Sequence, residues 1–517
     1  MNKHALVTFT TLLVICSAQA QIAPSIEWEH AQGGSLKDAA QDVRQTADGG
    51  YVVAAWAESE DGDVVANHGS TEMWLIKFDG MGNISWRKAL GGISGDGGQA
   101  IQQTTDGGYV VAGGCGSNDG DVSGNHGSSD VWVVKLDDMG NITWQKALGG
   151  TSYDVARGIE QTAEGGYIVA GETLSNNGDM TGNHGGYDAW VVKLDGMGNI
   201  TWQKTLGGTN YDGAYAVRPT TDGGYVIAGD TFSNNGDVTG NHGDHDAWVV
   251  KLDAVGNITW QRALGGSDAD NAHAVEQTTD DGYVVAGSAS STNGDVTGNH
   301  GVYDAWVVKL TAVGNITWQR ALGGSASDHA QAIQQTTDGG YVVAGSAGTN
   351  SGDVTGNHGG SDVWVVKLDD MGNITWQKAM GGTSDEEANA VRRTADGGYV
   401  VAGRTNSGDG EVTGYHDNMD AWVVKLATHA GKNGVEEPVM GSFHVGPNPS
   451  PGLIRIRSAL PLQNAQLTLT DALGREVLRE NMRGTSTTLD LTSWPRGLYL
   501  LAIRSEEGTS SQRLVLE

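Results

Sequence analysis

A strict internal repeat constrains this chain more than any other feature of its sequence. The Trp of a segment resembling W-V-V-K-L recurs at a constant step, at positions 74, 132, 190, 248, 306, 364 and 422. The Trp that ends a segment resembling N-I-T-W follows the same step, at positions 28, 86, 144, 202, 260, 318 and 376. Such a fixed period is typical of architectures in which each unit buries its faces only against its neighbours.

Each period contains four short segments with the character of β-strands. In the third copy they span residues 154–162, 167–171, 189–195 and 200–206, and each is bounded by Gly, Asn or Asp. Apolar and polar residues alternate within them with the period of two that a strand requires. Short turns join the first segment to the second and the third to the fourth. One unit is therefore predicted to be a four-stranded antiparallel meander.

The ends of the repeat array favour a ring over a line. The fourth segment has seven copies, but its first copy, residues 26–31, precedes any first segment, and nothing after Trp422 replaces it. In a ring, residues 26–31 complete the seventh sheet. We therefore predict an all-β chain with a seven-bladed β-propeller closed by its N-terminal strand. A β-helix is the alternative, although meander turns and so long a period fit its coils badly.

The propeller axis can also be placed from the sequence. Inner strands converge and accept only small side chains, which occur at one position of the first segment, namely Ala40, Gly98, Ala156, Ala214, Ala272, Ala330 and Ala388. The first segment is thus expected to be innermost. Strand parity then puts the long loops after the second and fourth segments on one side, the loop face, and the tight turns on the other, the turn face.

The repeat consists of a fixed series of short motifs. Its third period reads D-A-W-V-V-K-L at 188–194, G-N-I-T-W at 198–202 and L-G-G at 206–208, followed by Asp212 and by Y-V-I-A-G at 225–229. These motifs resemble the β-propeller repeats of bacterial surface proteins, and the resemblance covers roughly residues 26–427. It implies a fold but no single function, because propellers serve in binding, scaffolding and hydrolysis alike.

Composition and the first residues bear on compartment and partners. The chain has 62 Asp plus Glu against 31 Lys plus Arg, a net charge of −31, which disfavours nucleic acid as a partner. Residues 1–20 join a charged start, an apolar run and A-Q-A, and they predict a signal peptide and export. No later apolar run approaches the roughly 18 residues that a membrane-spanning helix needs, so no span is expected after cleavage. Cys115 is then the single cysteine, and no internal disulfide is predicted.

The composition changes after the last repeat. Residues 442–517 hold 8 Arg and 7 Asp plus Glu, a net charge of +1, and their alternating strands suggest a small β-sandwich. The predicted domains are thus a signal peptide at 1–20, the propeller at 21–427, a linker at 428–441 and a second domain at 442–517.

Three motifs mark the second domain. They are P-N-P at Pro447, Asn448 and Pro449, then D-A-L-G-R-E-V with Gly474, then G-L-Y with Gly497 and Tyr499. In this order they resemble the type A C-terminal sorting domain of the type IX secretion system of Bacteroidota. The resemblance implies that residues 442–517 engage the type IX machinery, that the protein crosses both membranes to the cell surface or the medium, and that this domain is then removed.

The long loop after the second segment offers candidate metal ligands. Its Asp and Asn carbonyl oxygens are hard donors of the kind that suit Ca²⁺. The competing interpretation, which is favoured, is that these residues build turns and that the loop His bonds to the backbone or to the Asp before each Trp, such as Asp130. A zinc site is disfavoured, and no cofactor is assigned. The candidate metal ligands are Asp63, Asp121, Asp179, Asp237, Asp295 and Asp353.

Two further repeated series have structural and functional interpretations. An acidic residue begins each inner strand, as Asp154 does, and the seven either ring the mouth of the channel or accept hydrogen bonds from the Gly-Gly turn before them. A Lys recurs in the middle of the third segment, as Lys193 does, and is predicted to be paired between blades.

A ligand-binding patch is expected where the copies differ. Aromatic residues break the pattern on the predicted loop face of neighbouring blades, and such rings stack on sugars or peptides. The candidates are Tyr153, Tyr187, Tyr211, Phe232, His245 and Tyr303.

The function predicted from the sequence is that of an exported binding or scaffold module for glycan or protein. Every carboxylate series recurs around the ring, whereas glycosidases need two carboxylates in different roles, so no catalytic residue is assigned. The alternatives are a carbohydrate-active hydrolase, which would be a glycoside hydrolase of endoglucanase type, and a structural surface-layer component.

Overall fold

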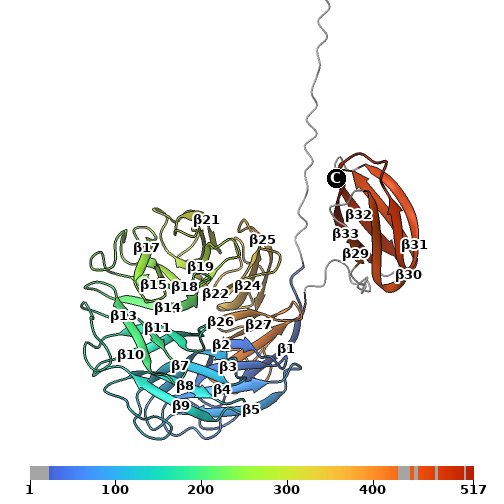
Figure 1. Ribbon diagram of the computed structural model, residues 1–517. Coiled ribbons are helices and arrows are strands. Elements are labelled where there is room, and N and C mark those ends of the chain that lie inside the picture. Colours follow the sequence, from blue (N-terminus) through green and yellow to red (C-terminus); the bar gives the residue numbers. More distant parts are fainter. Residues whose placement is uncertain (1–21, 429–442, 447–451, 472–474, 506–507, 517) are drawn as a thin grey trace, which may run out of the picture. The chain divides into compact units, whose positions relative to one another are not determined.

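Four antiparallel strands form each unit of the repeat in the computed structural model, which describes residues 22–428, 443–446, 452–471, 475–505 and 508–516. Two compact units are present, Met1–Gly431 and Lys432–Glu517. The first contains seven four-stranded sheets, the blades of a propeller (Figure 1). Blade 1 consists of β2 (Asp38–Gln45), β3 (Tyr51–Ala57), β4 (Glu72–Phe78) and β5 (Ile84–Leu90).

The next five blades repeat this order. Blade 2 has β6 (Asp96–Gln103), β7 (Tyr109–Cys115), β8 (Asp130–Leu136) and β9 (Ile142–Leu148). Blade 3 has β10 (Asp154–Gln161), β11 (Tyr167–Thr173), β12 (Asp188–Leu194) and β13 (Ile200–Leu206). Blade 4 has β14 (Asp212–Pro219), β15 (Tyr225–Thr231), β16 (Asp246–Leu252) and β17 (Ile258–Leu264). Blade 5 has β18 (Asp270–Gln277), β19 (Tyr283–Ala289), β20 (Asp304–Leu310) and β21 (Ile316–Leu322). Blade 6 has β22 (Asp328–Gln335), β23 (Tyr341–Ala347), β24 (Asp362–Leu368) and β25 (Ile374–Met380).

Blade 7 closes the ring with strands from both ends of the repeat array. Its order is β1-β28-β27-β26, with β26 (Glu386–Arg393), β27 (Tyr399–Thr405), β28 (Asp420–Leu426) and β1 (Ile26–Gln32). In Figure 1 the blue β1 lies beside the orange strands of the last repeat. The predicted seven-bladed propeller and its closure by residues 26–31 are confirmed.

The first strand of each blade is innermost, as the small residues predicted. The strands β2, β6, β10, β14, β18, β22 and β26 contact one another in sequence around the axis, including β26 with β2. The second strand is longer than the sequence suggested: β11 runs to Thr173, because Glu172 and Thr173 still pair with Val155 and Asp154. These two extra residues lie at the end of the strand that is nearest the loop face.

Aromatic contacts bind each blade to the next. The Trp of the outer strand meets the first Tyr of the next blade's second strand edge-on; Trp86 and Tyr109, for example, have ring centroids 5.8 Å apart. The same contact recurs around the ring and is completed by Trp28 of β1 with Tyr51 of β3 at 5.5 Å. A turn Gly packs on the same Trp: a Cβ on Gly140, whose φ is +76°, would lie 3.1 Å from Trp86. The Trp and Gly of the repeat therefore specify the interface between blades.

The buried Lys series is paired within a blade, and the prediction of pairing between blades is wrong. Lys251 of β16 lies 2.9 Å from Asp222, in the tight turn between β14 and β15 of the same blade. It also donates to the carbonyl of Leu252 at 2.9 Å. Gly224, just before β15, leaves room for the ammonium group, since a Cβ there would lie 2.6 Å from Lys251 Nζ. In blade 7, Lys425 also reaches Glu27 on β1, so there it adds to ring closure.

The second unit is a single five-stranded sheet in its described residues. The strands are β29 (Phe443–Gly446), β30 (Leu453–Asp471), β31 (Glu476–Asp490), β32 (Gly497–Ser505) and β33 (Gly508–Leu516). Its core draws on both halves of the long β30, with Ile454 and Ile456 from one and Leu467 and Leu469 from the other. The fold is all-β as predicted, while the division into two sheets that a sandwich requires is not confirmed.

Ring closure by β1 provides the first testable prediction. A chain that begins at Gly33 loses the β1–β28 ladder and the Trp28 contact, whereas a chain that begins at Ser25 keeps both. We expect the shorter chain to be less stable by several kcal/mol, at roughly 1 kcal/mol for each net hydrogen bond lost. Thermal and urea unfolding of the two chains measures the difference. Equal stability would show that blade 7 does not need β1.

Candidate functional site

Five aromatic rings form a continuous row on the loop face of blades 3 and 4. Successive ring centroids are 6.2 Å apart for Tyr153 and Tyr187, 5.6 Å for Tyr187 and Tyr211, and 5.7 Å for Tyr211 and Phe232. Phe232 and His245 stack at 4.4 Å. The first five sequence candidates are thus brought together, and we call them the aromatic row. Tyr303 stands apart in blade 5, where it contacts His329 at 5.5 Å.

Strand ends hold the aromatic row in place. Tyr153, Tyr187, Tyr211 and His245 each directly precede the first residue of a strand, and Phe232 directly follows β15. Backbone hydrogen bonds fix these positions: Asp212 N donates to the carbonyl of Tyr187 at 2.7 Å, and Phe232 N donates to that of Tyr211 at 2.9 Å. The aromatic side chains therefore project from a rigid scaffold and not from the tips of the long loops.

A hollow lies at each end of this part of the loop face. One, of about 430 Å³, is lined by the glycines of blade 2, including Gly95, Gly97 and Gly114, and is walled by Tyr153. The other, of about 480 Å³, lies in blades 5 to 7 and carries Tyr303 and His329. It also contains an ion pair of 2.7 Å between Arg404 and Glu387. Each hollow has the volume of a small-molecule site.

A buried chain of polar groups supports the aromatic row from below. Arg157 Nε donates to Glu172 Oε1 at 2.8 Å, and the Tyr211 hydroxyl donates to Glu172 Oε2 at 2.7 Å. The Tyr211 and Tyr215 hydroxyls are 3.0 Å apart. Asp230 lies close by, and its Oδ1 is buried without a hydrogen-bond partner in the described residues. Glu172 and Asp230 are 4% and 5% exposed.

Burial shifts the titration of Asp230 in this chain. Tyr211 donates its one proton to Glu172, so the proton between the two hydroxyls belongs to Tyr215. Burial raises the pKa of Asp230 to about 7, and the nearby Glu172 adds to the rise. Asp230 therefore holds its proton more tightly than an exposed Asp does. Glu172 and Asp230 are both buried behind the tyrosines, and we assign them to positioning the aromatic row.

The six candidate metal ligands make other contacts. Asp121, Asp179, Asp237, Asp295 and Asp353 each accept a hydrogen bond of 3.3–3.4 Å from the first glycine N–H of the L-G-G segment. Asp63 forms an ion pair of 2.8 Å with Arg87. Within the described residues, no group of three or more His, Cys, Asp and Glu side chains is placed to hold a metal ion. In this structure the six Asp side chains therefore bind a glycine N–H or, for Asp63, an arginine.

The loop His and the second acidic series both have structural partners. His126 Nδ1 lies 2.5 Å from Asp130 Oδ2, and the same contact recurs in every blade. Asp154 at the start of β10 accepts from Gly150 N at 2.9 Å, as its counterparts do, and it is fully buried. The seven acidic residues that begin the inner strands are thus buried and accept hydrogen bonds from the Gly-Gly turns.

Sequence reasoning missed the side chains that line the axial channel. The fourth residue of each inner strand lines the axial channel, and the seven blades carry five different residue types there: Gln41, Gln99, Arg157, Tyr215, His273, Gln331 and Asn389. The signal was this variability at one register position of the innermost strand. Burial lowers the pKa of His273 to about 4, so it is neutral near pH 7.

Comparison with known proteins identifies the second unit. Residues 444–517 match the secretion system C-terminal sorting domain. The protein is therefore a seven-bladed β-propeller that carries such a domain, and the predicted type IX sorting region is confirmed. This tail implies export to the cell surface or the extracellular space. Pro447, Asn448, Pro449 and Gly474 lie outside the described residues. Tyr499 is buried and its hydroxyl donates to the carbonyl of Pro495 at 2.8 Å, while Gly497 has a φ of +149°.

The relatives of the propeller are distant. Regulatory protein FlaEY of Caulobacter vibrioides is 23% identical over 335 residues, which is 57% of this chain and 35% of FlaEY. The chain thus spans about a third of that relative's length. The structure of a puromycin hydrolase is 11% identical, covers 90% of this chain and 58% of its own, and has a TM-score of 0.41. PorZ of Porphyromonas gingivalis, described as a surface component of the type IX secretion system, is 10% identical over 92% of this chain and 81% of its own, with a TM-score of 0.18. Neither structure carries an argument about function at these scores.

No helix in the described residues is long and apolar enough to cross a membrane.

The proton on Asp230 provides the second prediction. A carboxyl with a raised pKa in the folded state stabilises the fold below its unfolded pKa of 3.8, and this contribution is lost as pH rises through about 7. We therefore expect Asp230→Asn to gain stability over the parent at pH 8 and little at pH 4, at roughly 1.4 kcal/mol per unit of pKa difference. Urea unfolding from pH 4 to 8 measures the change. An Asp222→Asn control, in a turn where Lys251 lowers the carboxyl pKa to about 2, should lose stability instead.

Proposed function

We propose that this protein is an exported glycan-binding propeller whose ligand lies along the aromatic row. The observation that carries the proposal is the continuity of the five rings, which two neighbouring blades supply in a fold that otherwise repeats itself. The other blades have Gly, Ala, Ser, Thr, Lys, Asp or Met at the positions that precede their inner and third strands, apart from Tyr303. A repeated scaffold with one irregular face is typical of a binding module.

The chemistry around the row suits carbohydrate. Pyranose rings present flat CH faces that pack on aromatic rings, and their hydroxyls take short polar side chains. Asn210 lies in the loop beside Tyr211, and Asn271 bonds to His245 at 3.1 Å. The glycine-lined hollow next to Tyr153 continues the same surface into blade 2. A glycan several residues long could therefore follow the row from blade 2 to blade 4.

Delivery to the cell exterior belongs to the same proposal. Residues 1–20 act as a signal peptide, and the C-terminal domain takes the chain across the outer membrane through the type IX machinery. The domain is then removed, so the propeller is the working part at the surface. Net charge supports an extracellular role, since a strongly acidic chain stays soluble and avoids phosphate polymers.

The third prediction concerns the central ring of the row. Tyr187 contacts both Tyr153 and Tyr211, so Tyr187→Ala should weaken glycan binding by roughly tenfold or more, the loss expected for one stacked aromatic anchor. Native gels that contain laminarin, xyloglucan, mannan or hydroxyethyl cellulose measure retardation of the full mature chain, with Ca²⁺ or with a chelator. Met197→Ala is the matched control, because Met197 is exposed on the turn face of blade 3.

Each outcome of the gel series has a meaning. Retardation that Tyr187→Ala abolishes and Met197→Ala preserves would support the proposal. Loss of retardation in the presence of chelator would indicate that the loop Asp residues bind Ca²⁺. Equal retardation of all three proteins would place the binding surface elsewhere. Cleared zones or new reducing ends would favour the competing glycoside hydrolase. Failure to bind any glycan would favour a protein partner or a structural role.

The sorting domain provides the fourth prediction. A chain that ends at residue 441 should accumulate in the periplasm of its host, whereas the complete chain should reach the surface or the medium without residues 442–517. Fractionation with an antibody against the propeller measures this. Export of the truncated chain would contradict the assignment.

A further inference from the structure

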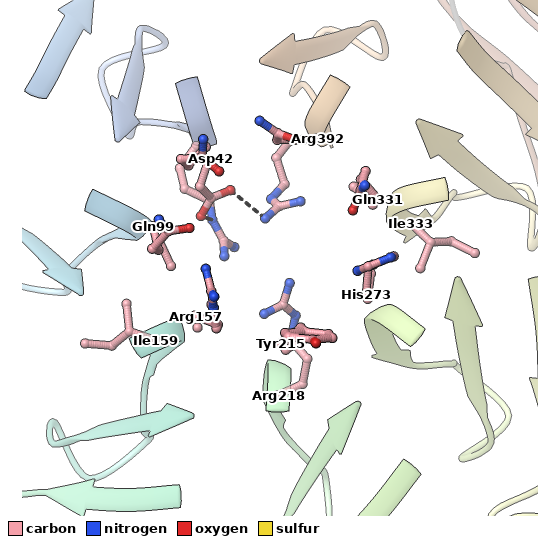
Figure 2. A pocket seen from close by; sticks show the side chains of 18 residues that line it. Asp42, Gln99, Arg157, Ile159, Tyr215, Arg218, His273, Gln331, Ile333 and Arg392 are labelled. Carbon is pink, nitrogen blue, oxygen red and sulfur yellow. Dashed lines mark hydrogen bonds and ion pairs between the residues drawn. The ribbon is translucent and has the colours of Figure 1, made fainter. Parts of the chain in front are cut away.

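The axial channel holds a small cavity that every blade helps to line. It has a volume of about 90 Å³ and is bounded by the fourth to seventh residues of the inner strands (Figure 2). That volume accommodates a few waters or one small ion, but not a sugar ring. The cavity is separate from the aromatic row, so the nature of its occupant does not depend on the proposed glycan binding.

Four arginines from four blades converge on this cavity. Arg44 of β2, Arg157 of β10, Arg218 of β14 and Arg392 of β26 all line it. Figure 2 shows the guanidinium groups of Arg218 and Arg392 directed toward its centre. In a chain with a net charge of −31, this is a local concentration of positive charge. Arginine presents several N–H donors in a planar fork that matches oxyanions and carboxylates.

The carboxylates that pair with these arginines are fewer than the arginines. Asp42 is shared by Arg44 at 3.2 Å and Arg392 at 2.7 Å. Glu160 is shared by Arg44 at 2.9 Å and Arg218 at 2.7 Å. Arg157 pairs with Glu172, which lies toward the loop face. Four guanidiniums therefore form ion pairs with three carboxylates, and Asp42 and Glu160 each serve two arginines.

Glu276 of β18 is a fourth carboxylate close to these arginines. Its Oε2 accepts a hydrogen bond of 2.6 Å from Gln335 N. Burial raises the pKa of this carboxyl, and the charges of the neighbouring arginines oppose the rise. His273, on the same strand, is neutral near pH 7. The arginines are thus matched in number by carboxylates, but not every arginine donor has an acceptor in the part of the chain that the structure describes.

Within the described ranges, Arg392 has a buried donor atom without a partner. Its Nη2 donates to Asp42 and its Nη1 to the carbonyl of Val391 at 2.8 Å. Its Nε is buried and has no acceptor among the described residues. Burial, followed by repulsion from Arg44, lowers the pKa of the Arg392 guanidinium to about 10. A buried cationic donor without an acceptor costs free energy, which an anion placed between the arginines would recover.

We propose that the axial cavity binds one small oxyanion or carboxylate group, held by Arg392, Arg44 and Arg218. The neutral side chains of Gln99, Gln331 and Asn389 complete the lining on other sides. The bound group then joins side chains of blades 1, 4 and 7 at the axis.

Titration calorimetry of the full mature chain with sodium sulfate, sodium phosphate and sodium acetate at constant ionic strength tests the fifth prediction. We expect saturable binding of one anion per chain. Comparing sulfate and phosphate with acetate distinguishes a free oxyanion from a carboxylate. Comparing sodium glucuronate with glucose shows whether a carboxylate on a sugar also enters the cavity. Heats that do not saturate, for all of these anions, would overturn the proposal and leave a channel filled by water alone.

Two variants of opposite effect locate the site. Arg392→Gln should weaken anion binding by roughly tenfold, as expected for the loss of a charge-assisted hydrogen bond. Glu160→Gln removes a competing carboxylate and should strengthen binding. Arg262→Gln is the matched control and should bind as the parent does, because the Arg262 guanidinium on the outer strand β17 donates to the carbonyls of Gly314 and Val313 in the turn before β21. Equal affinity in all variants would place the anion outside the channel and overturn the assignment. Selenate in crystals, located by anomalous scattering, decides the position even where a variant fails to fold.

Discussion

A buried carboxylate at the start of each inner strand is the interaction on which the propeller depends. Asp154 accepts hydrogen bonds from Gly150 N at 2.9 Å, from the Ser175 hydroxyl at 2.7 Å and from the Thr173 hydroxyl at 2.5 Å. Its own N–H donates to the carbonyl of Ser129 in the previous blade at 2.7 Å. One residue thus joins the connection between blades, the end of the second strand and the long loop. Charge-assisted bonds of this kind are worth more than neutral ones, and all seven blades contain them.

This uniform scaffold confines variation to two places. Residues that build the blades and their interfaces are nearly identical in every copy, because each must fit the same neighbours. Side chains at the channel axis and at the ends of strands on the loop face contact no such fixed partner. There the copies differ, and there Arg157, Tyr215 and His273 or the aromatic row are found. A symmetric fold therefore carries asymmetric sites without a single insertion in its loops.

The same distinction explains what the sequence could predict. The strands, the blade number, closure by β1 and the clustering of Tyr153, Tyr187 and Tyr211 follow from spacing, because positions one period apart occupy equivalent places in the ring. The pairing of Lys251 with Asp222 was predicted wrongly, since spacing gives the strand but not the direction in which a long side chain crosses it. Arg392 and Asp42 lie 350 residues apart and share no motif. Their contact depends on channel width and rotamers, which no repeat pattern encodes.

The buried carboxylates of the scaffold also make its stability depend on pH. The first glycine of each L-G-G lies between two buried carboxylates; a Cβ on Gly149 would come within 2.6 Å of Asp130 and 2.8 Å of Asp154. Burial raises the pKa of Asp130, and it raises that of Asp188 to about 6. These two carboxyls therefore bind protons more tightly in the folded state than in the unfolded chain, and the stability that Asp188 contributes declines as pH rises through about 6. The loop histidines oppose this decline, because each Nδ1 contacts the third-strand carboxylate and stabilises its ionised form. His and Asp thus recur together in the repeat because the His gives the buried carboxylate a hydrogen-bond donor.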